Sequence, residues 1–98
     1  MNPPATAFGA GFALANAIPH LAEGMAGRSF PSPFARPPGR GMSSPTTNVL
    51  WGLANVAGGC VLLRSDRCDL DDERNVAALF GGATVCAVVC ARWFRELH

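Results

Sequence analysis

Charged residues are absent from three long blocks of this chain. Residues 1–22, 41–63 and 75–91 contain no Asp, Glu, Lys or Arg, so all fifteen charges lie outside these blocks. A helix that crosses a bilayer needs about 20 predominantly apolar residues, and the blocks contain 22, 23 and 17. The pattern therefore predicts an all-α integral membrane domain over residues 1–98, with three transmembrane helices in an up-down-up bundle.

Capping residues set the expected limits of the first two helices. We expect the first helix over about 5–24, after the Pro3–Pro4 pair. The second is expected over about 45–64, because Ser44 is a good N-cap residue and Pro45 suits the first helical position.

The connection to the third helix is acidic. Four aspartates lie in the loop over 65–72. Acidic side chains stabilise the positive end of the helix dipole, so Asp71, Asp72 and Glu73 are expected to open the third helix. That helix is predicted over about 73–94.

A soluble, Ala-rich three-helix bundle is the alternative architecture. Its helices would need a polar stripe along their whole length, and the second helix offers only Asn48 and Asn55. The charged fraction is 15%, against about 25% in an ordinary globular domain. Both observations favour the membrane protein. A cleaved signal peptide is not expected, because residues 1–6 lack a basic side chain, although residues 15–17 resemble a cleavage site.

Residues 28–44 form a long connection rich in proline and arginine. Four prolines exclude a regular helix or a central strand. We expect an extended segment at the level of the lipid headgroups, with Phe30 and Phe34 turned inward. The arginines of this loop can bind phosphate headgroups or an acidic partner surface, or they can serve only to set the topology; they are Arg28, Arg36 and Arg40.

Arginine counts predict the orientation in the membrane. The loop over 28–44 and the C-terminal tail share five arginines, and the other side has three. Since cytoplasmic segments carry the excess of Arg and Lys, we expect the loop and the C-terminus in the cytoplasm. The chain has no Lys, which is typical of GC-rich coding and points to a bacterial source, so the membrane that we expect is the bacterial inner membrane. A net charge of +1 gives no case for nucleic-acid binding.

Three polar residues share one face of the first predicted helix. Asn16, His20 and Glu23 follow one another at i, i+4 and i+7. Ionisable groups inside a membrane are functional hypotheses by default, so the three can form a proton or ion relay facing Asn48 and Asn55. The structural interpretation, which the pattern favours, pairs Glu23 with Arg28 or solvent. In it, His20 and the amides make hydrogen bonds between helices.

The cysteines and the rest of the chain offer little for catalysis. Cys86 and Cys90 have the spacing of two metal ligands, but no CxxC or HExxH pattern accompanies them. Cysteine also packs as a small residue. No nucleophile set, paired carboxylate or phosphate loop is present in the sequence. We therefore expect no metal, no cofactor and no enzymatic activity.

Four short motifs lie between His20 and Gly52: FPSPF over 30–34, PPG over 37–39, SSP over 43–45 and NVLWG over 48–52. This run covers about a third of the chain. It resembles a group of short, uncharacterised bacterial integral membrane proteins. The resemblance implies a membrane location and carries no activity or site with it.

Small residues four apart recur in all three predicted helices, and such ridges let helices approach closely in lipid. Because these ridges are too many for three short helices to cover by packing against one another, we expect a structural, accessory or oligomer-forming subunit. Its partners would be other membrane proteins or further copies of itself. The alternative is a small oligomeric transporter or channel, coupled to protons or ions through Asn16, His20 and Glu23.

Overall fold

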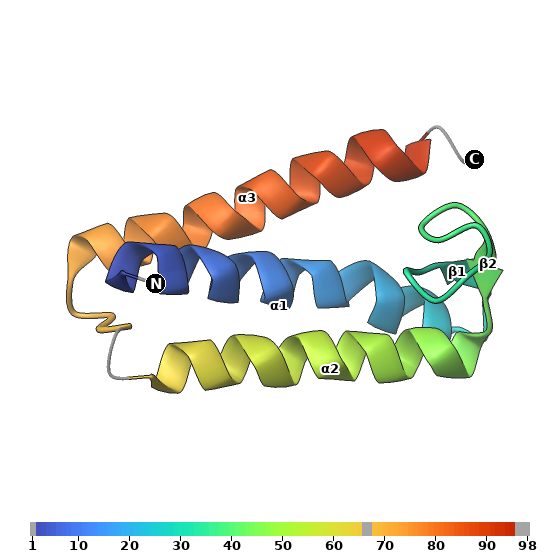
Figure 1. Cartoon of the computed structure of the whole chain (residues 1–98), viewed down its shortest axis with the longest axis horizontal. Helices are drawn as coiled ribbons and strands as arrows, with labels where there is room; N and C mark the ends of the chain where they lie inside the picture. The colour runs from blue at the N-terminus through green and yellow to red at the C-terminus, as the bar shows by residue number, and fades with distance from the viewer. Residues whose placement is uncertain (1, 66–67, 96–98) are drawn as a thin grey trace.

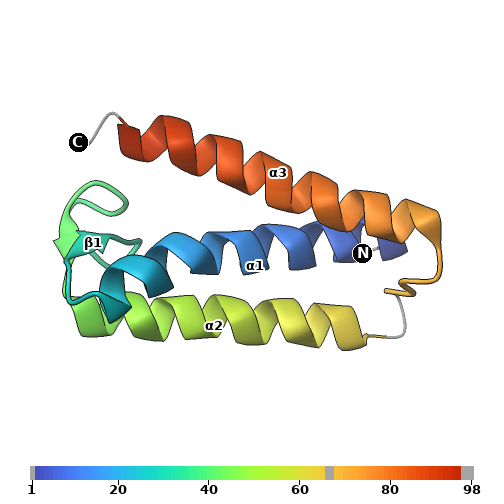
Figure 2. The same ribbon diagram turned by 180° about the vertical axis from the view of Figure 1, so that it is seen from behind.

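Three helices lie side by side in the order α2, α1, α3, and α2 runs antiparallel to the other two (Figures 1 and 2). This computed structural model describes residues 2–65 and 68–95. The helices are α1 (Pro3–Met25), α2 (Pro45–Arg64) and α3 (Glu73–Arg95). α1 packs against both of the others, whereas α2 and α3 make few contacts with each other. The predicted, mostly helical architecture is thus confirmed, with α1 as its centre.

The first two helices begin at polar caps. α1 begins at Pro3, two residues before the predicted start, because Asn2 is the N-cap and its Oδ1 accepts a hydrogen bond from Ala5 N–H at 2.9 Å. Proline fits the first turn, where its missing N–H costs nothing. α2 begins at Pro45, as predicted, and Ser44 Oγ accepts from Thr47 N–H at 3.1 Å.

The acidic connection ends in a cap for α3. Asp72 Oδ1 accepts a hydrogen bond from Arg74 N–H at 2.9 Å, and the helix begins between them at Glu73. Asn75 Nδ2 donates to the carbonyl of Asp69 at 2.9 Å. Asp66 and Arg67 of this loop, and residues 96–98 of the predicted cytoplasmic tail, lie outside the described residues.

Glycines allow α1 to approach both neighbours. A Cβ at Gly11 would lie 1.9 Å from the carbonyl oxygen of Leu79, and one at Gly82 would lie 2.0 Å from that of Phe8. Against α2, side chains of α1 fill the space over Gly52 and Gly59. At these positions the small residues pack against other helices of the same chain. Our expectation that they need a partner protein is therefore wrong for these positions.

The Pro/Arg-rich loop is folded rather than extended, which corrects the prediction. Two short strands, β1 (Phe30–Pro31) and β2 (Met42–Ser43), pair antiparallel at its base. Between them the chain turns back, because the Ser32 carbonyl accepts from the N–H groups of Ala35 and Gly39. The loop forms a lobe at one end of the bundle, beside the end of α3 (Figure 1).

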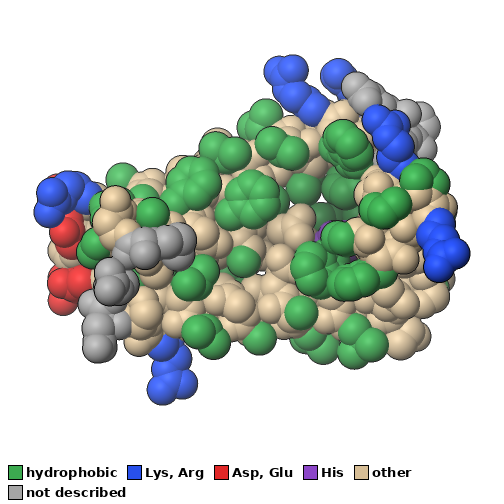
Figure 3. All heavy atoms as spheres, viewed as in Figure 1, with side chains coloured by type: hydrophobic (Ala, Val, Ile, Leu, Met, Phe, Trp, Pro, Cys, Tyr) green, Lys and Arg blue, Asp and Glu red, His purple; other side chains and the backbone are tan. Residues whose placement is uncertain are grey.

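The outer helices bury small and polar residues and expose large apolar ones. The buried positions are Asn48, Gly52 and Gly59 in α2 and Asn75, Gly82 and Cys86 in α3. Large side chains at 50–69% exposure lie outside, including those of Leu50, Val61, Phe80 and Val89. Charges gather toward the two ends of the molecule (Figure 3). In the described residues, α2 and α3 are long and apolar enough to cross a membrane.

Candidate functional site

A buried histidine and a buried asparagine join α1 to α2 near the loop. His20 is 3% exposed and Asn48 is fully buried. Their Nδ1 and Oδ1 atoms lie 2.7 Å apart. The Asn48 amide nitrogen lies within 3.2 Å of three carbonyl oxygens, those of Phe30, Ser43 and Ser44. Asn48 therefore ties α1 and α2 to both strands at the base of the loop.

These hydrogen bonds determine which tautomer the neutral imidazole of His20 adopts. Carbonyl oxygens only accept, so the Asn48 amide must direct its NH₂ group toward them and its oxygen toward His20. His20 Nδ1 is consequently the donor. In the neutral ring Nε2 then carries the lone pair. No hydrogen bond from another described residue reaches Nε2.

A second pair of amides lies on the same face of α1. Asn16 Nδ2 donates to Asn55 Oδ1 at 3.2 Å, and Asn55 Nδ2 donates to the Trp51 carbonyl at 2.9 Å. The thiols of Cys86 and Cys90 each lie 3.9 Å from Asn16 Oδ1. The two cysteines are free thiols, and among the described residues no group of three or more His, Cys, Asp or Glu could hold a metal ion.

Glu23 forms an ion pair with Arg28, the first residue of the loop. Its carboxylate pairs with Arg28 at 2.5 and 3.3 Å. The hydrogen bond from Arg28 to Glu23, and then the attraction between their charges, raises the pKa of Arg28 above its ordinary value. Asn16 and His20, by contrast, form hydrogen bonds with residues of α2. These two residues of the polar face of α1 therefore link the two helices.

Beneath the loop lies a cavity of about 140 Å³, lined by Asn16, His20, Pro31, Ser32, Pro33, Gly39, Trp51, Trp93 and Phe94. The loop, all three helices and one short strand contribute to its wall. The surface is hollowed at this end of the molecule, among apolar side chains (Figure 3).

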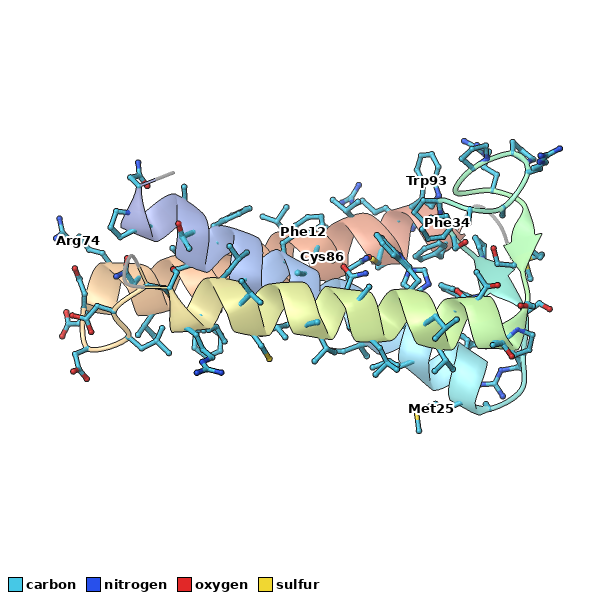
Figure 4. The ribbon with its side chains drawn as sticks, turned by 60° about the horizontal axis from the view of Figure 1, so that its bottom comes forward. Phe12, Met25, Phe34, Arg74, Cys86 and Trp93 are labelled. Carbon is cyan, nitrogen blue, oxygen red and sulfur yellow. The ribbon has the colours of Figure 1, made fainter. Side chains whose placement is uncertain are left out.

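Trp93 connects the end of α3 to the loop. Its indole Nε1 donates a hydrogen bond to the Gly39 carbonyl at 2.8 Å. The Arg40 guanidinium lies 4.8 Å from the centre of the same ring, a cation–π distance. Figure 4 shows Trp93 and Phe34 at the loop end, with Phe12 and Cys86 closer to the middle of the bundle. Trp93 therefore forms part of the cavity wall on the side of α3 and is tied to the loop.

Aromatic rings pack against one another around the cavity. Phe30 packs between the rings of His20 and Phe94, with centroids at 5.4 and 4.6 Å. Trp51 meets His20 and Phe34 edge to face, at 6.5 and 5.2 Å. Phe30 is buried as predicted, but Phe34 is 64% exposed and only rests on Trp51. The buried Nε1 of Trp51 has no partner in the described structure, and such a group costs about 1–3 kcal/mol.

The structure brings together four of the predicted polar residues, namely Asn16, His20, Asn48 and Asn55. Of the loop arginines, Arg28 is engaged by Glu23 and Arg40 by Trp93, while Arg36 is exposed; none lines the cavity. Sequence reasoning missed Ser32 and Gly39 as wall residues. The Pro-Gly step at 38–39, a turn signal, was the available indication that the loop folds back.

Comparisons with protein-family models, curated proteins and solved structures found no match to this chain. The site consists of a buried imidazole, fixed through Nδ1, whose Nε2 receives no hydrogen bond from a described residue, beside a small cavity with mostly apolar walls.

Proposed function

We propose that this chain is a small integral membrane protein with three spans, which acts without catalysis as a structural, accessory or oligomer-forming subunit. One observation carries the proposal: the outer helices bury asparagine and glycine and expose leucine, valine and phenylalanine. Large exposed apolar surfaces indicate contact with a membrane or with protein partners. Hydrocarbon also requires polar groups to be satisfied inside the bundle.

α1 is the third span in this proposal. Its 23 residues correspond to about 34 Å of helix, enough to cross the hydrocarbon core. It packs between α2 and α3, so it shares their surroundings. Its buried histidine and its Asn16 amide bond to α2, as polar groups within a membrane are expected to do. Extraction of membranes at alkaline pH tests this: release of the chain into the supernatant would refute membrane insertion.

The loop and the end of α3 lie at the same end of the bundle (Figure 1), and we place that end in the bacterial cytoplasm. Five arginines belong to it, against three at the other end. A C-terminal fusion to a fluorescent protein that folds only in the cytoplasm should fluoresce, and a fusion to alkaline phosphatase should be inactive. The opposite pair of results would reverse the orientation.

The partner surface that we propose lies on the outside of α2. Gly58 is exposed, and a Cβ there would meet nothing within 4 Å. No described residue of this chain therefore packs closely against Gly58. Ala54, also exposed, lies four residues before it. Small residues at this spacing support helix association in lipid.

Purification in mild detergent tests the partner. The wild-type chain should elute as an oligomer or with a second protein, and Gly58→Leu should shift it to the monomer. Thr84→Leu, on the exposed face of α3, is the matched control and should leave the assembly unchanged. A strictly monomeric wild type with no co-purifying protein would refute the subunit role.

A transporter or channel coupled to protons or ions is the second candidate. The unpaired ring nitrogen of His20 beside a cavity favours it. The ion pair between Glu23 and Arg28 weighs against a relay along Asn16, His20 and Glu23. Proton or ion flux into liposomes should be lost in His20→Ala and Glu23→Gln if this role is correct. Unchanged flux in both variants would exclude it.

A further inference from the structure

Among the side chains of its described lining residues, the cavity beneath the loop has one hydrogen-bond acceptor left over. The side chains of Asn16, Ser32 and Trp93 each have a partner within the described structure. The remaining polar atoms of the lining side chains are Nε2 of His20 and Nε1 of Trp51, and Nε1 of Trp51 is fully buried. His20 is more than nine-tenths buried and lines the cavity directly. An acceptor held in this way calls for a hydroxyl or N–H donor, from water or from a bound molecule.

The size and the walls of the cavity restrict what can bind. Its volume is about 140 Å³, and a protein cavity of about 150 Å³ holds one benzene-sized ring. Aromatic and proline rings make up most of the wall, which suits edge-to-face packing of another ring. No charged side chain among the described residues lines it, so an ionic ligand would find no counter-ion among them.

We propose that this cavity binds a neutral, single-ring hydroxyl compound, a phenol in chemical class, whose O–H donates to Nε2 of His20. A cluster of water fits less well, because each buried water needs two to four polar partners and these walls offer few. A phenol satisfies the acceptor with one group and covers the apolar walls with its ring. This inference goes beyond the subunit role and does not depend on it.

The ring can belong to a free phenol or to the head of a lipid-like molecule. A larger apolar groove of about 380 Å³ runs between α1 and α3 and shares Phe94 with the cavity. Its other lining residues are Ala15, Ile18, Pro19, Phe30, Ala87, Cys90 and Ala91. An alkyl chain attached to the ring would lie in this groove. Ligands with and without such a chain therefore distinguish a lipid-like molecule from a free phenol.

Fluorine NMR titration of the full chain in detergent micelles tests the proposal. We expect 4-fluorophenol to bind saturably and 4-fluoroanisole, which has the same ring and oxygen but no O–H, to bind roughly tenfold more weakly. Absence of saturable 4-fluorophenol binding, or equal binding of the two compounds, would overturn the proposal. The comparison uses the wild-type protein, so it holds whether or not a variant folds.

A variant and a longer ligand complete the experiment. In His20→Phe the preference for phenol over anisole should disappear, and its persistence would also overturn the assignment. Binding of 4-octylphenol roughly tenfold tighter than that of 4-fluorophenol would support the site and identify the amphiphile as the source. Equal binding of these two phenols would support the site and identify the free phenol.

Discussion

His20 donates a hydrogen bond from Nδ1 to Oδ1 of Asn48, 28 residues further along the chain, at 2.7 Å. The same amide reaches carbonyls at both strands of the loop base. One residue of α2 thereby fixes a helix, a loop and the ring orientation of a histidine. The hydrogen bond between Asn48 and His20 thus sets how the imidazole lies in the cavity wall.

Asn48→Ala should destabilise the protein by about 2–4 kcal/mol, because it leaves a buried imidazole N–H and loop carbonyls without partners. Unfolding by SDS in mixed micelles measures the loss. Thr46→Ala, on the exposed side of the same helix turn, is the control and should change stability by less than about 0.5 kcal/mol. Equal effects of the two substitutions would contradict the role of Asn48.

Gly82→Ala should separate α1 from α3 and cost about 1–3 kcal/mol. The new Cβ would lie 2.0 Å from the Phe8 carbonyl, and backbone cannot yield as a side chain can. The neighbouring Gly81→Ala is the control, since its Cβ would meet only the Phe8 ring at 3.9 Å. It should gain up to about 1 kcal/mol from helix propensity. A loss in both variants, or in neither, would argue against the close contact.

Trp93→Phe should loosen the loop while retaining an aromatic ring on α3. The variant loses the hydrogen bond to the Gly39 carbonyl and weakens the contact with Arg40, which together are worth about 1–2 kcal/mol. Amide hydrogen exchange over residues 32–41 should become faster, with little change in α1. Arg36→Ala, at an exposed loop position, should leave exchange unchanged.

The cap of α3 should respond to acid. The backbone N–H of Arg74, and then its side chain, lower the pKa of Asp72 below its ordinary value. Folding therefore favours the ionised carboxylate: its stabilisation is present above about pH 4 and is lost as the pH falls through the lower, folded pKa. We expect the amide signals of residues 74–76 to titrate in this acidic range, and Asp72→Asn to abolish the change.

Asp71→Asn, at the neighbouring exposed carboxylate, is the control for this effect and should preserve it. A titration that survives in Asp72→Asn would place its origin elsewhere in the acidic loop.

Part of the site could be predicted because its signals are local. Asn16 and His20 lie one turn apart, and Asn48 and Asn55 lie two turns apart, so each pair had to share a helix face. The pairing across the helices, His20 with Asn48 and Asn16 with Asn55, could not be derived. It depends on the axial register of α1 against α2, which close contacts over glycines set.

Residue patterns alone were enough to predict the number of helices, the cap of α2 and the segregation of charge to the ends, because capping and charge patterning operate within a few residues. The packing of the helices was needed to show that α1 is central, that its glycine contacts are satisfied internally and that the proline-rich loop folds back onto Trp93. These features join residues as far as 74 positions apart, as Phe8 and Gly82 are. Contacts at such separations depend on how whole elements pack, and spacing along a single chain does not encode them.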